Sequence, residues 1–321
     1  AWLYDEFAGR WVLITVPPVE LKSTIVSRIG PPWKWLRDAG ERFYCISHNE
    51  GIAIYLNVDR RKIVRSDRFR MLFRRFAVSD GPDLPAVDWR ILRGEDNKRS
   101  LQNSAFGWCK VADPRGDVPT GQHPHRHVYD DLATPSFDSL DPAQWEQAFR
   151  FAYKDMASRF ANRARFNALM MGQRLGTGDP QERLLEELGA DVVHLNIPRT
   201  YAQTYSCPCR PTGQPATCEV PGYFKDPRTV EGELLPSNRI TAAQLEAMDA
   251  VERATQHEQR SVPLEGKWFR KAAWGFWRVL PAGARLYLGL DASGGGTDAK
   301  HSHSSIVIIA EHDGELYWLD E

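Results

Sequence analysis

The sequence predicts an α/β protein: a three-layer fold around a mostly parallel sheet, followed by the first strands of a second, smaller domain. Short apolar runs alternate along most of the chain with longer amphipathic segments, which is the pattern of parallel strands joined by crossover helices. Near the end, three strand-like runs follow one another with only turns between them. This change of period predicts a new domain.

Each element follows from a local signal. Apolar, β-branched runs predict strands, and apolar residues at helical spacing predict helices. The proline pairs at 17–18 and 31–32 are expected to end the first strand and the first helix. The predicted strands cover 11–16, 42–48, 125–131, 166–173, 191–198, 284–291, 304–312 and 314–321. The predicted helices cover 23–30, 51–73, 143–164, 180–188 and 241–261.

We expect a first domain over 1–235, a connecting region over 236–280 and the start of a second domain over 281–321. The chain begins with Ala rather than Met and stops within a predicted strand, so we expect both ends to lie inside a longer protein.

Composition sets further bounds. An apolar content of 42% with 11 Trp excludes a disordered chain, and the longest apolar runs are too short to cross a membrane. The net charge is −1, so only local clusters can indicate a nucleic acid. Five scattered Cys suggest a reducing compartment rather than a disulfide framework.

A phosphate-binding loop is suggested where the first strand ends. Lys22, Ser23 and Thr24 stand between an apolar strand and a helix, where a lysine can reach phosphates and a hydroxyl can bind Mg²⁺. The usual glycines are absent, because Val16 and Leu21 occupy their places. The alternative is a surface Lys-Ser-Thr with Ser or Thr as helix cap.

Two further strand ends carry suitable polar residues. Asp130 and Asp131 close the strand at 125–131; the first could hold Mg²⁺ and the second could polarise an attacking water. Gln173 follows the strand at 166–173, where an amide could sense a γ-phosphate. The alternatives are a solvated acidic pair and a simple glycine-rich turn.

A basic cluster lies at 60–75, with eight Lys or Arg against one acid. Such a cluster can bind DNA phosphates without reading sequence, and the alternative is a solvated helix face. The residues that we assign to DNA binding are Arg60, Arg61, Lys62 and Arg65.

In this order, the motifs resemble those of the large terminase subunit of tailed bacteriophages. The matching stretches are VPPVELKST, TGQHPHRHVYDDLATP, SRFANRARFNALMMGQRLGTGDP and ATQHEQRSVPLEGKWF. The Pro-Pro-x-x-x-Lys-Ser loop is typical of the family and adds Pro18 to the ATP-binding residues. The resemblance implies a P-loop NTPase fold and hydrolysis of ATP with Mg²⁺ by a motor that drives double-stranded DNA into a procapsid.

The resemblance also implies partners. These are the portal protein, a small terminase subunit and further copies of the chain in a ring, in the host cell cytoplasm and transiently at the portal. Relatives often carry a basic residue inside the loop, where this chain has Val19 and Glu20, so the catalytic arginine is expected to come from elsewhere. Arg159 is then a candidate for that arginine; the alternative is a surface helix residue.

The last motif, LGLDASGGGTD, resembles the first metal-binding strand of an RNase H-like endonuclease that cuts concatemeric DNA. Asp291 and Asp298 would bind Mg²⁺ or Mn²⁺ there; the alternative is a flexible turn. The other acids of such a site are absent from this sequence, so we expect the nuclease domain to be incomplete here.

Two other functions stay open. The chain could be a P-loop helicase or remodelling ATPase, or an inactive prophage remnant that only binds DNA or a portal. The sequence leaves open the role of Cys207, Cys209 and Cys218, for which zinc binding is one reading.

Overall fold

The computed structural model describes residues 9–77, 90–94, 96–116, 121–134, 141–162, 166–202, 226, 228–235, 239–262, 277–291 and 305–320. The chain divides into two compact units, Ala1–Leu264 and Glu265–Glu321.

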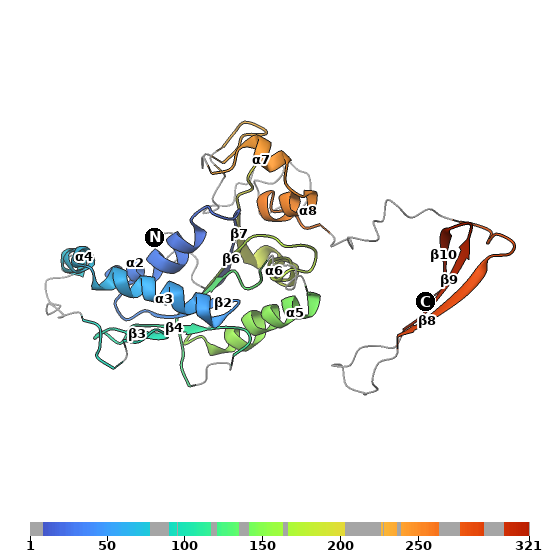
Figure 1. Ribbon diagram of the computed structural model, residues 1–321. Coiled ribbons are helices and arrows are strands. Elements are labelled where there is room, and N and C mark those ends of the chain that lie inside the picture. The colour runs from blue at the N-terminus through green and yellow to red at the C-terminus, as the bar shows by residue number, and fades with distance from the viewer. Residues whose placement is uncertain are drawn as a thin grey trace. The chain divides into compact units, whose positions relative to one another are not determined.

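The first unit is built on a seven-stranded sheet with the strand order β3-β4-β2-β5-β6-β1-β7 (Figure 1). Every neighbouring pair in it is parallel except β3 and β4. The strands are β1 Arg10–Thr15, β2 Arg42–Ser47, β3 Ser100–Gln102, β4 Trp108–Ala112, β5 Arg126–Asp130, β6 Asn167–Gly172 and β7 Val192–Asn196. The mostly parallel sheet is therefore confirmed.

Side chains alternate along each strand between two buried layers. On β1, Val12 and Ile14 join the cluster under the helices of residues 23–77, whereas Trp11 and Leu13 join the cluster under the helices of residues 142–188. Since both faces of a parallel sheet are covered, its strands are apolar throughout. The predicted three-layer α/β arrangement is confirmed (Figure 1).

The helices of the first unit begin and end mostly near the predicted positions. They are η1 Ser23–Ile29, α2 Gly30–Arg37, α3 Glu50–Arg65, α4 Asp67–Ala77, α5 Pro142–Arg150, η3 Phe151–Met156, η4 Ala157–Arg159, α6 Pro180–Leu188, η5 Gly189–Asp191, α7 Ala242–Glu246, α8 Ala250–Glu252 and η7 Arg253–His257. Within the described part of the chain, no helix combines the length and apolarity that crossing a membrane requires.

Two helix predictions were wrong at their ends. The first helix continues past Pro31 and Pro32, because these prolines occupy the first turn of α2, where an N–H group is not needed. The helix expected over 51–73 breaks at Ser66, whose backbone is extended. The Ser66 hydroxyl accepts from the Phe69 N–H at 3.2 Å and so begins α4.

The helix expected over 241–261 is also interrupted, and Asp249 caps a new start. Its described residues pack on the first unit: the Arg199 N–H donates to the His257 carbonyl at 2.7 Å, and the Arg174 N–H donates to Gln259 Oε1 at 3.2 Å. Residues up to 262 of the expected connecting region thus belong to the first unit.

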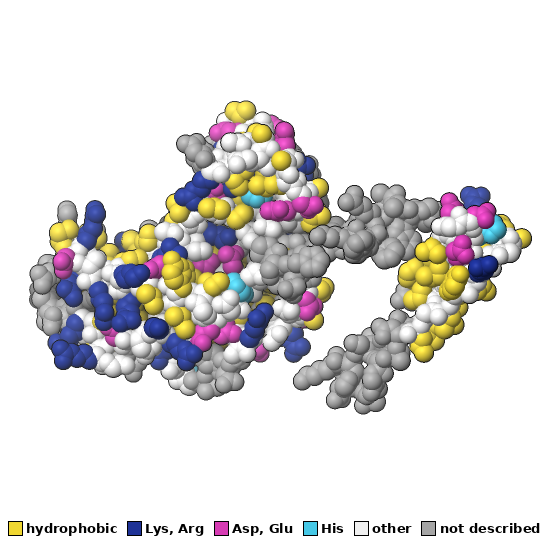
Figure 2. Space-filling view, viewed as in Figure 1, with side chains coloured by type: hydrophobic (Ala, Val, Ile, Leu, Met, Phe, Trp, Pro, Cys, Tyr) yellow, Lys and Arg dark blue, Asp and Glu magenta, His cyan; other side chains and the backbone are white. Residues whose placement is uncertain are grey.

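The second unit contains an antiparallel sheet with the order β10-β9-β8. Its strands are β8 Arg285–Asp291, β9 Ser305–His312 and β10 Glu315–Asp320. Leu286, Leu288 and Leu290 share one face of β8 and are exposed, and hydrophobic side chains run along this sheet in Figure 2. The three predicted strands are present, whereas an RNase H-like identity stays a prediction.

His127 on β5 is a fully buried titratable group within the first unit. Its ring stacks on Phe160 at a centroid distance of 4.0 Å, and its Nδ1 lies 2.9 Å from the Tyr129 hydroxyl. That hydroxyl donates to the Ala152 carbonyl, so Nδ1 carries the proton and donates to it. Burial lowers the pKa of His127 to about 3.

This burial makes the stability of the first unit depend on pH. Between about pH 6.5 and pH 3 only the unfolded state protonates His127, so the free energy of unfolding falls as the pH falls, by up to about 1.4 kcal/mol per pH unit. His127→Asn keeps a donor near Nδ1 but cannot titrate. We expect a shallower pH dependence for this variant in denaturant unfolding between pH 8 and pH 4; equal slopes would contradict the assignment.

Candidate active site

The carboxyl ends of three neighbouring strands bring the predicted residues together. Strand β6 pairs with β1 on one side and with β5 on the other. The residue after β6 therefore lies between the loop after β1 and the acids at the end of β5. In open α/β sheets, this edge is where ligands bind.

The loop after β1 has positive φ angles at two residues that are not glycine. Val19 and Leu21 have φ angles of 69° and 62°, and Lys22 returns to the right-handed helical region. Alternating left- and right-handed residues turn successive N–H groups toward one point, which forms a concavity for anions. The Val16 N–H donates to the Gly172 carbonyl at 3.2 Å and ties the loop to β6.

Lys22 spans the site. Its Nζ lies 3.3 Å from Asp131 Oδ1 and 3.5 Å from Gln173 Oε1. The next residue, Ser23, donates its hydroxyl to Asp130 Oδ1 at 2.9 Å. Residues that are more than 100 positions apart in the sequence thus form one polar cluster, as the motif order predicts.

Burial dominates the electrostatics of Asp131. Desolvation raises its pKa, Lys22 lowers it and the charge of Asp130 raises it, and together they leave the pKa of Asp131 at about 6. The backbone of Asp131 is left-handed, with φ 48°. Its carbonyl accepts from the His48 N–H at 3.2 Å and from His48 Nδ1 at 3.0 Å, so the ring must carry its proton on Nδ1.

The pair of Ser23 and Asp130 fits a magnesium ion. Asp130 is buried, and its Oδ2 has no hydrogen-bond partner among the described residues. A carboxylate oxygen and a hydroxyl are ligands that Mg²⁺ accepts, while phosphates and waters complete its octahedron. No cluster of three or more His, Cys, Asp or Glu capable of holding a metal occurs in the described ranges.

Gln173 connects the cluster to elements outside it. Its carbonyl accepts from Gln181 Nε2 of α6 at 3.3 Å, and a Cβ on Gly172 would lie 2.3 Å from that same Nε2. The following residue, Arg174, pairs with Asp179, the N-cap of α6, at 2.9 Å. A displacement of Gln173 would therefore reach α6 directly.

Several predicted residues lie elsewhere. Arg159 is at the opposite edge of the sheet, where its carbonyl accepts from His123 Nδ1 at 3.2 Å just before β5 begins. It cannot touch Lys22 of the same chain, so a catalytic role would require a second copy. Asp291 is the last residue of β8, and Asp298 lies outside the described residues, as do Cys207, Cys209 and Cys218.

The basic cluster divides into structural and exposed residues. Arg60 is fully buried and donates to the Ser27 carbonyl of η1 at 2.7 Å, so its assignment to DNA binding is corrected to a structural one. Arg61 and Arg65 both pair with Asp96. Lys62 pairs with Asp59 at 3.0 Å, and its side chain is 71% exposed. Figure 2 shows Lys and Arg gathered over this part of the first unit.

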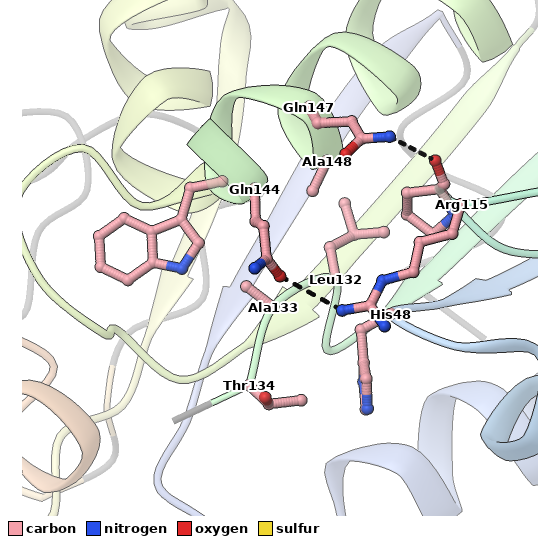
Figure 3. Close-up of a pocket in the computed structure, with 10 residues that line it drawn as sticks. His48, Arg115, Leu132, Ala133, Thr134, Gln144, Gln147 and Ala148 are labelled. Atoms are coloured by element: carbon pink, nitrogen blue, oxygen red, sulfur yellow. Dashed lines mark hydrogen bonds between the residues drawn. The ribbon is translucent and has the colours of Figure 1, made fainter. Parts of the chain in front are cut away.

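A hollow adjoins the cluster on the side of Asp131. It is lined by His48, Leu132, Thr134, Arg115 and Gln144, among others. Figure 3 shows the hydrogen bond from Arg115 Nη2 to Gln144 Oε1, which measures 3.2 Å. The hollow does not include Lys22 or Ser23, so it is a neighbour of the polar cluster rather than the place where the predicted residues meet.

Sequence reasoning missed two residues of the site, His48 and Arg199. His48 is the last residue of the strand predicted over 42–48. In a parallel sheet this position lies at the same end as Asp131, and this signal could have found it. Arg199 contacts the loop through Glu20 at 2.5 Å. No local signal marks it, because its partner lies 179 residues earlier.

Comparison with solved structures finds large terminases of bacteriophages. The HK97 bacteriophage large terminase matches with a TM-score of 0.45 and 12% identity, over 97% of this chain and 58% of that chain. The large terminase from the thermophilic bacteriophage D6E matches at 10% identity in two crystal forms. Form 2 has a TM-score of 0.39 over 98% of this chain and 64% of that chain; form 3 has 0.40 over 100% and 66%.

The chain thus spans 58% to 66% of the length of these structures. They belong to the family that the sequence motifs resemble. No protein-family model matches the chain, and no curated protein matches it.

The ion pair of Lys22 and Asp131 gives a direct test of the site's electrostatics. Lys22→Met removes the cation that opposes burial, so we expect the pKa of Asp131 to rise above about 6. Carboxyl NMR of the protein with ¹³C-labelled Asp, in EDTA, measures this shift. Lys154→Met, at an exposed lysine of η3, is the matched control; an unchanged Asp131 titration in Lys22→Met would refute the contact.

Proposed function

We propose that the first unit binds and hydrolyses ATP with Mg²⁺ as the motor domain of a viral DNA-packaging enzyme. One observation carries this proposal: Lys22, Ser23, Asp130, Asp131 and Gln173 converge from three strands at one edge of a parallel sheet. A cation, a hydroxyl, two carboxylates and an amide are the groups that phosphoryl transfer to water requires.

Each residue has a distinct task in this mechanism. The loop N–H groups and Lys22 Nζ bind the β- and γ-phosphates, while the Ser23 hydroxyl and Asp130 hold Mg²⁺, which neutralises charge on the phosphates when bound. Asp131 orients the attacking water and accepts its proton. Gln173 responds to loss of the γ-phosphate and passes the change to α6 through Gln181.

The resting contacts support this division. In the structure Lys22 is shared between Asp131 and Gln173. A triphosphate would draw the ammonium group away from both. Asp131 would then lose the cation that lowers its pKa and become a stronger base as the substrate arrives.

Double-stranded DNA is the proposed polymer that the motor moves. The exposed basic residues of α3 and α4 form a surface suited to its phosphates; they are Lys62, Arg65, Arg68 and Arg70. The sequence resemblance supports the remaining assignments: a ring of copies docked on a portal protein in the host cytoplasm, a small terminase subunit, Arg159 acting on a neighbouring copy, and endonuclease ions at Asp291 and Asp298.

The first test is DNA-stimulated ATP hydrolysis in Mg²⁺. We expect Lys22→Ala and Asp131→Asn to lower kcat by at least about a hundredfold, the usual effect of losing a catalytic base or phosphate ligand. Asp155→Asn, at an exposed acid of η3, is the control and should keep full activity.

The outcomes separate the alternatives. A folded wild-type protein that binds DNA without turning over ATP would favour the inactive remnant. ATP turnover coupled to strand displacement on a forked duplex would favour a helicase, since a packaging motor moves along duplex DNA without separating it.

The DNA surface gives a second prediction. Charge reversal in Lys62→Glu should weaken binding to duplex DNA and reduce the slope of log K against log salt by about one, because each phosphate contact contributes about 0.9. Lys154→Glu makes the same charge change away from the α3–α4 surface. Filter binding from 50 to 200 mM salt measures both; equal losses in the two variants would exclude a localised surface.

A further inference from the structure

The phosphate loop holds a conformation that its own residues disfavour. Val19 and Leu21 have positive φ angles, which is a genuine outlier for a β-branched or bulky side chain. Their side chains are 60% and 50% exposed, so packing of these side chains does not hold the backbone in place. Another part of the protein must supply the constraint.

Two arginines, Arg199 and Arg239, donate hydrogen bonds to the loop. Arg199 is 1% exposed; its Nη1 donates to Glu20 Oε1 at 2.5 Å and its Nη2 to the Pro18 carbonyl at 3.4 Å. Arg239 Nη1 donates to the Val19 carbonyl. In a trans peptide the N–H points opposite to the C=O, so these contacts turn the N–H groups of Val19 and Glu20 away from the arginines.

Arg199 is itself fixed by the chain that follows β7. Its N–H donates to the His257 carbonyl at 2.7 Å, and its carbonyl accepts from the Leu235 N–H at 2.8 Å and from Arg228 Nη1 at 2.9 Å. Arg228 is in turn paired with Asp226 at 2.6 Å. These contacts fix the backbone of Arg199. Its guanidinium can therefore hold Val19 and Leu21 at positive φ angles.

We propose that Arg199 is a positioning residue of the nucleotide site, which does through Glu20 and the Pro18 carbonyl what glycines do in the usual loop. This inference rests on the proposed ATPase function for its ligand, the triphosphate of a nucleotide. Arg199 shapes the loop from behind and does not touch the phosphates. Its loss should weaken nucleotide binding more than it slows the chemical step.

The experiment compares Arg199→Ala with the same variant carrying a glycine in the loop. We expect Arg199→Ala to raise the Kd for Mg·ATP about tenfold or more, the effect of losing a charged hydrogen bond, with a smaller change in kcat. Val19→Gly in that background should restore most of the affinity, because glycine adopts the positive φ without help. Arg183→Ala, which removes another paired arginine, is the control.

Further variants at Glu20 test whether the loss of affinity comes from the contact between Arg199 and Glu20 rather than from misfolding. Glu20→Gln keeps Arg199 in place and weakens only the ion pair, so it should show a milder loss of the same kind. Glu20→Ala and Arg199→Ala should be non-additive when combined, because each removes the same contact. Unchanged affinity in Arg199→Ala, or no rescue by Val19→Gly in a folded protein, overturns the inference.

A readout without nucleotide separates this inference from the proposed function. Amide hydrogen exchange of peptides covering residues 16–24 should speed up in Arg199→Ala and stay unchanged in Arg183→Ala. If wild type binds no ATP, the proposed function fails, while the exchange data still decide whether Arg199 holds the loop. Equal exchange in wild type and Arg199→Ala would refute the role of Arg199 whatever the ligand.

Discussion

The parallel pairing of β6 between β1 and β5 is the constraint on which the site depends. Neighbouring strands lie about 4.8 Å apart, so the ends of β1 and β5 are separated by roughly two strand spacings. The loop after β1 spans that gap, and from it Lys22 reaches Asp131 and Ser23 reaches Asp130. Glycine fits at position 172 at the end of β6, whereas a Cβ there would come close to both Gln181 Nε2 and Asp131 Oδ1.

Burial at the carboxyl ends of these strands disfavours the charged form of the carboxylates. Partial desolvation and the neighbouring charge of Asp130 both disfavour the ionised form of Asp131, and its pKa rises accordingly. Lys22 relieves this repulsion in the absence of substrate. The same cation therefore stabilises the cluster as observed and, under the proposed function, is the group that phosphates would recruit, which would link substrate binding to activation of the base through one ammonium group.

The sequence predicted the parts of this architecture that have local signals. The strands at β1, β5, β6 and β7 followed from short apolar runs, and the candidate site residues followed from the polar motifs at the ends of these runs and from their order. Strands β3 and β4 were not predicted, because Ser100–Gln102 is short and Trp108–Ala112 lies in a segment without clear periodicity. Proline is a stop signal only inside a helix, so Pro31 at the start of α2 misled the prediction.

The arginines show where local reasoning ends. Arg60 and Lys62 belong to one basic run, yet the helical period turns Arg60 toward Ser27 in the interior and Lys62 toward solvent. Charge alone does not separate them, but position on the helix face does. No local sequence pattern marks Arg199, because its partner Glu20 lies 179 residues earlier in the chain.

The conformation of the glycine-poor loop also depends on residues that are distant in the sequence. What a phosphate loop requires is a set of φ angles that points N–H groups inward, and glycine is only the least strained way to obtain them. A chain that places Val19 and Leu21 there must supply the restraint from elsewhere. Here the restraint comes from residues after β7, so the described part of the region expected to be a connector, up to residue 262, is structurally part of the proposed nucleotide site.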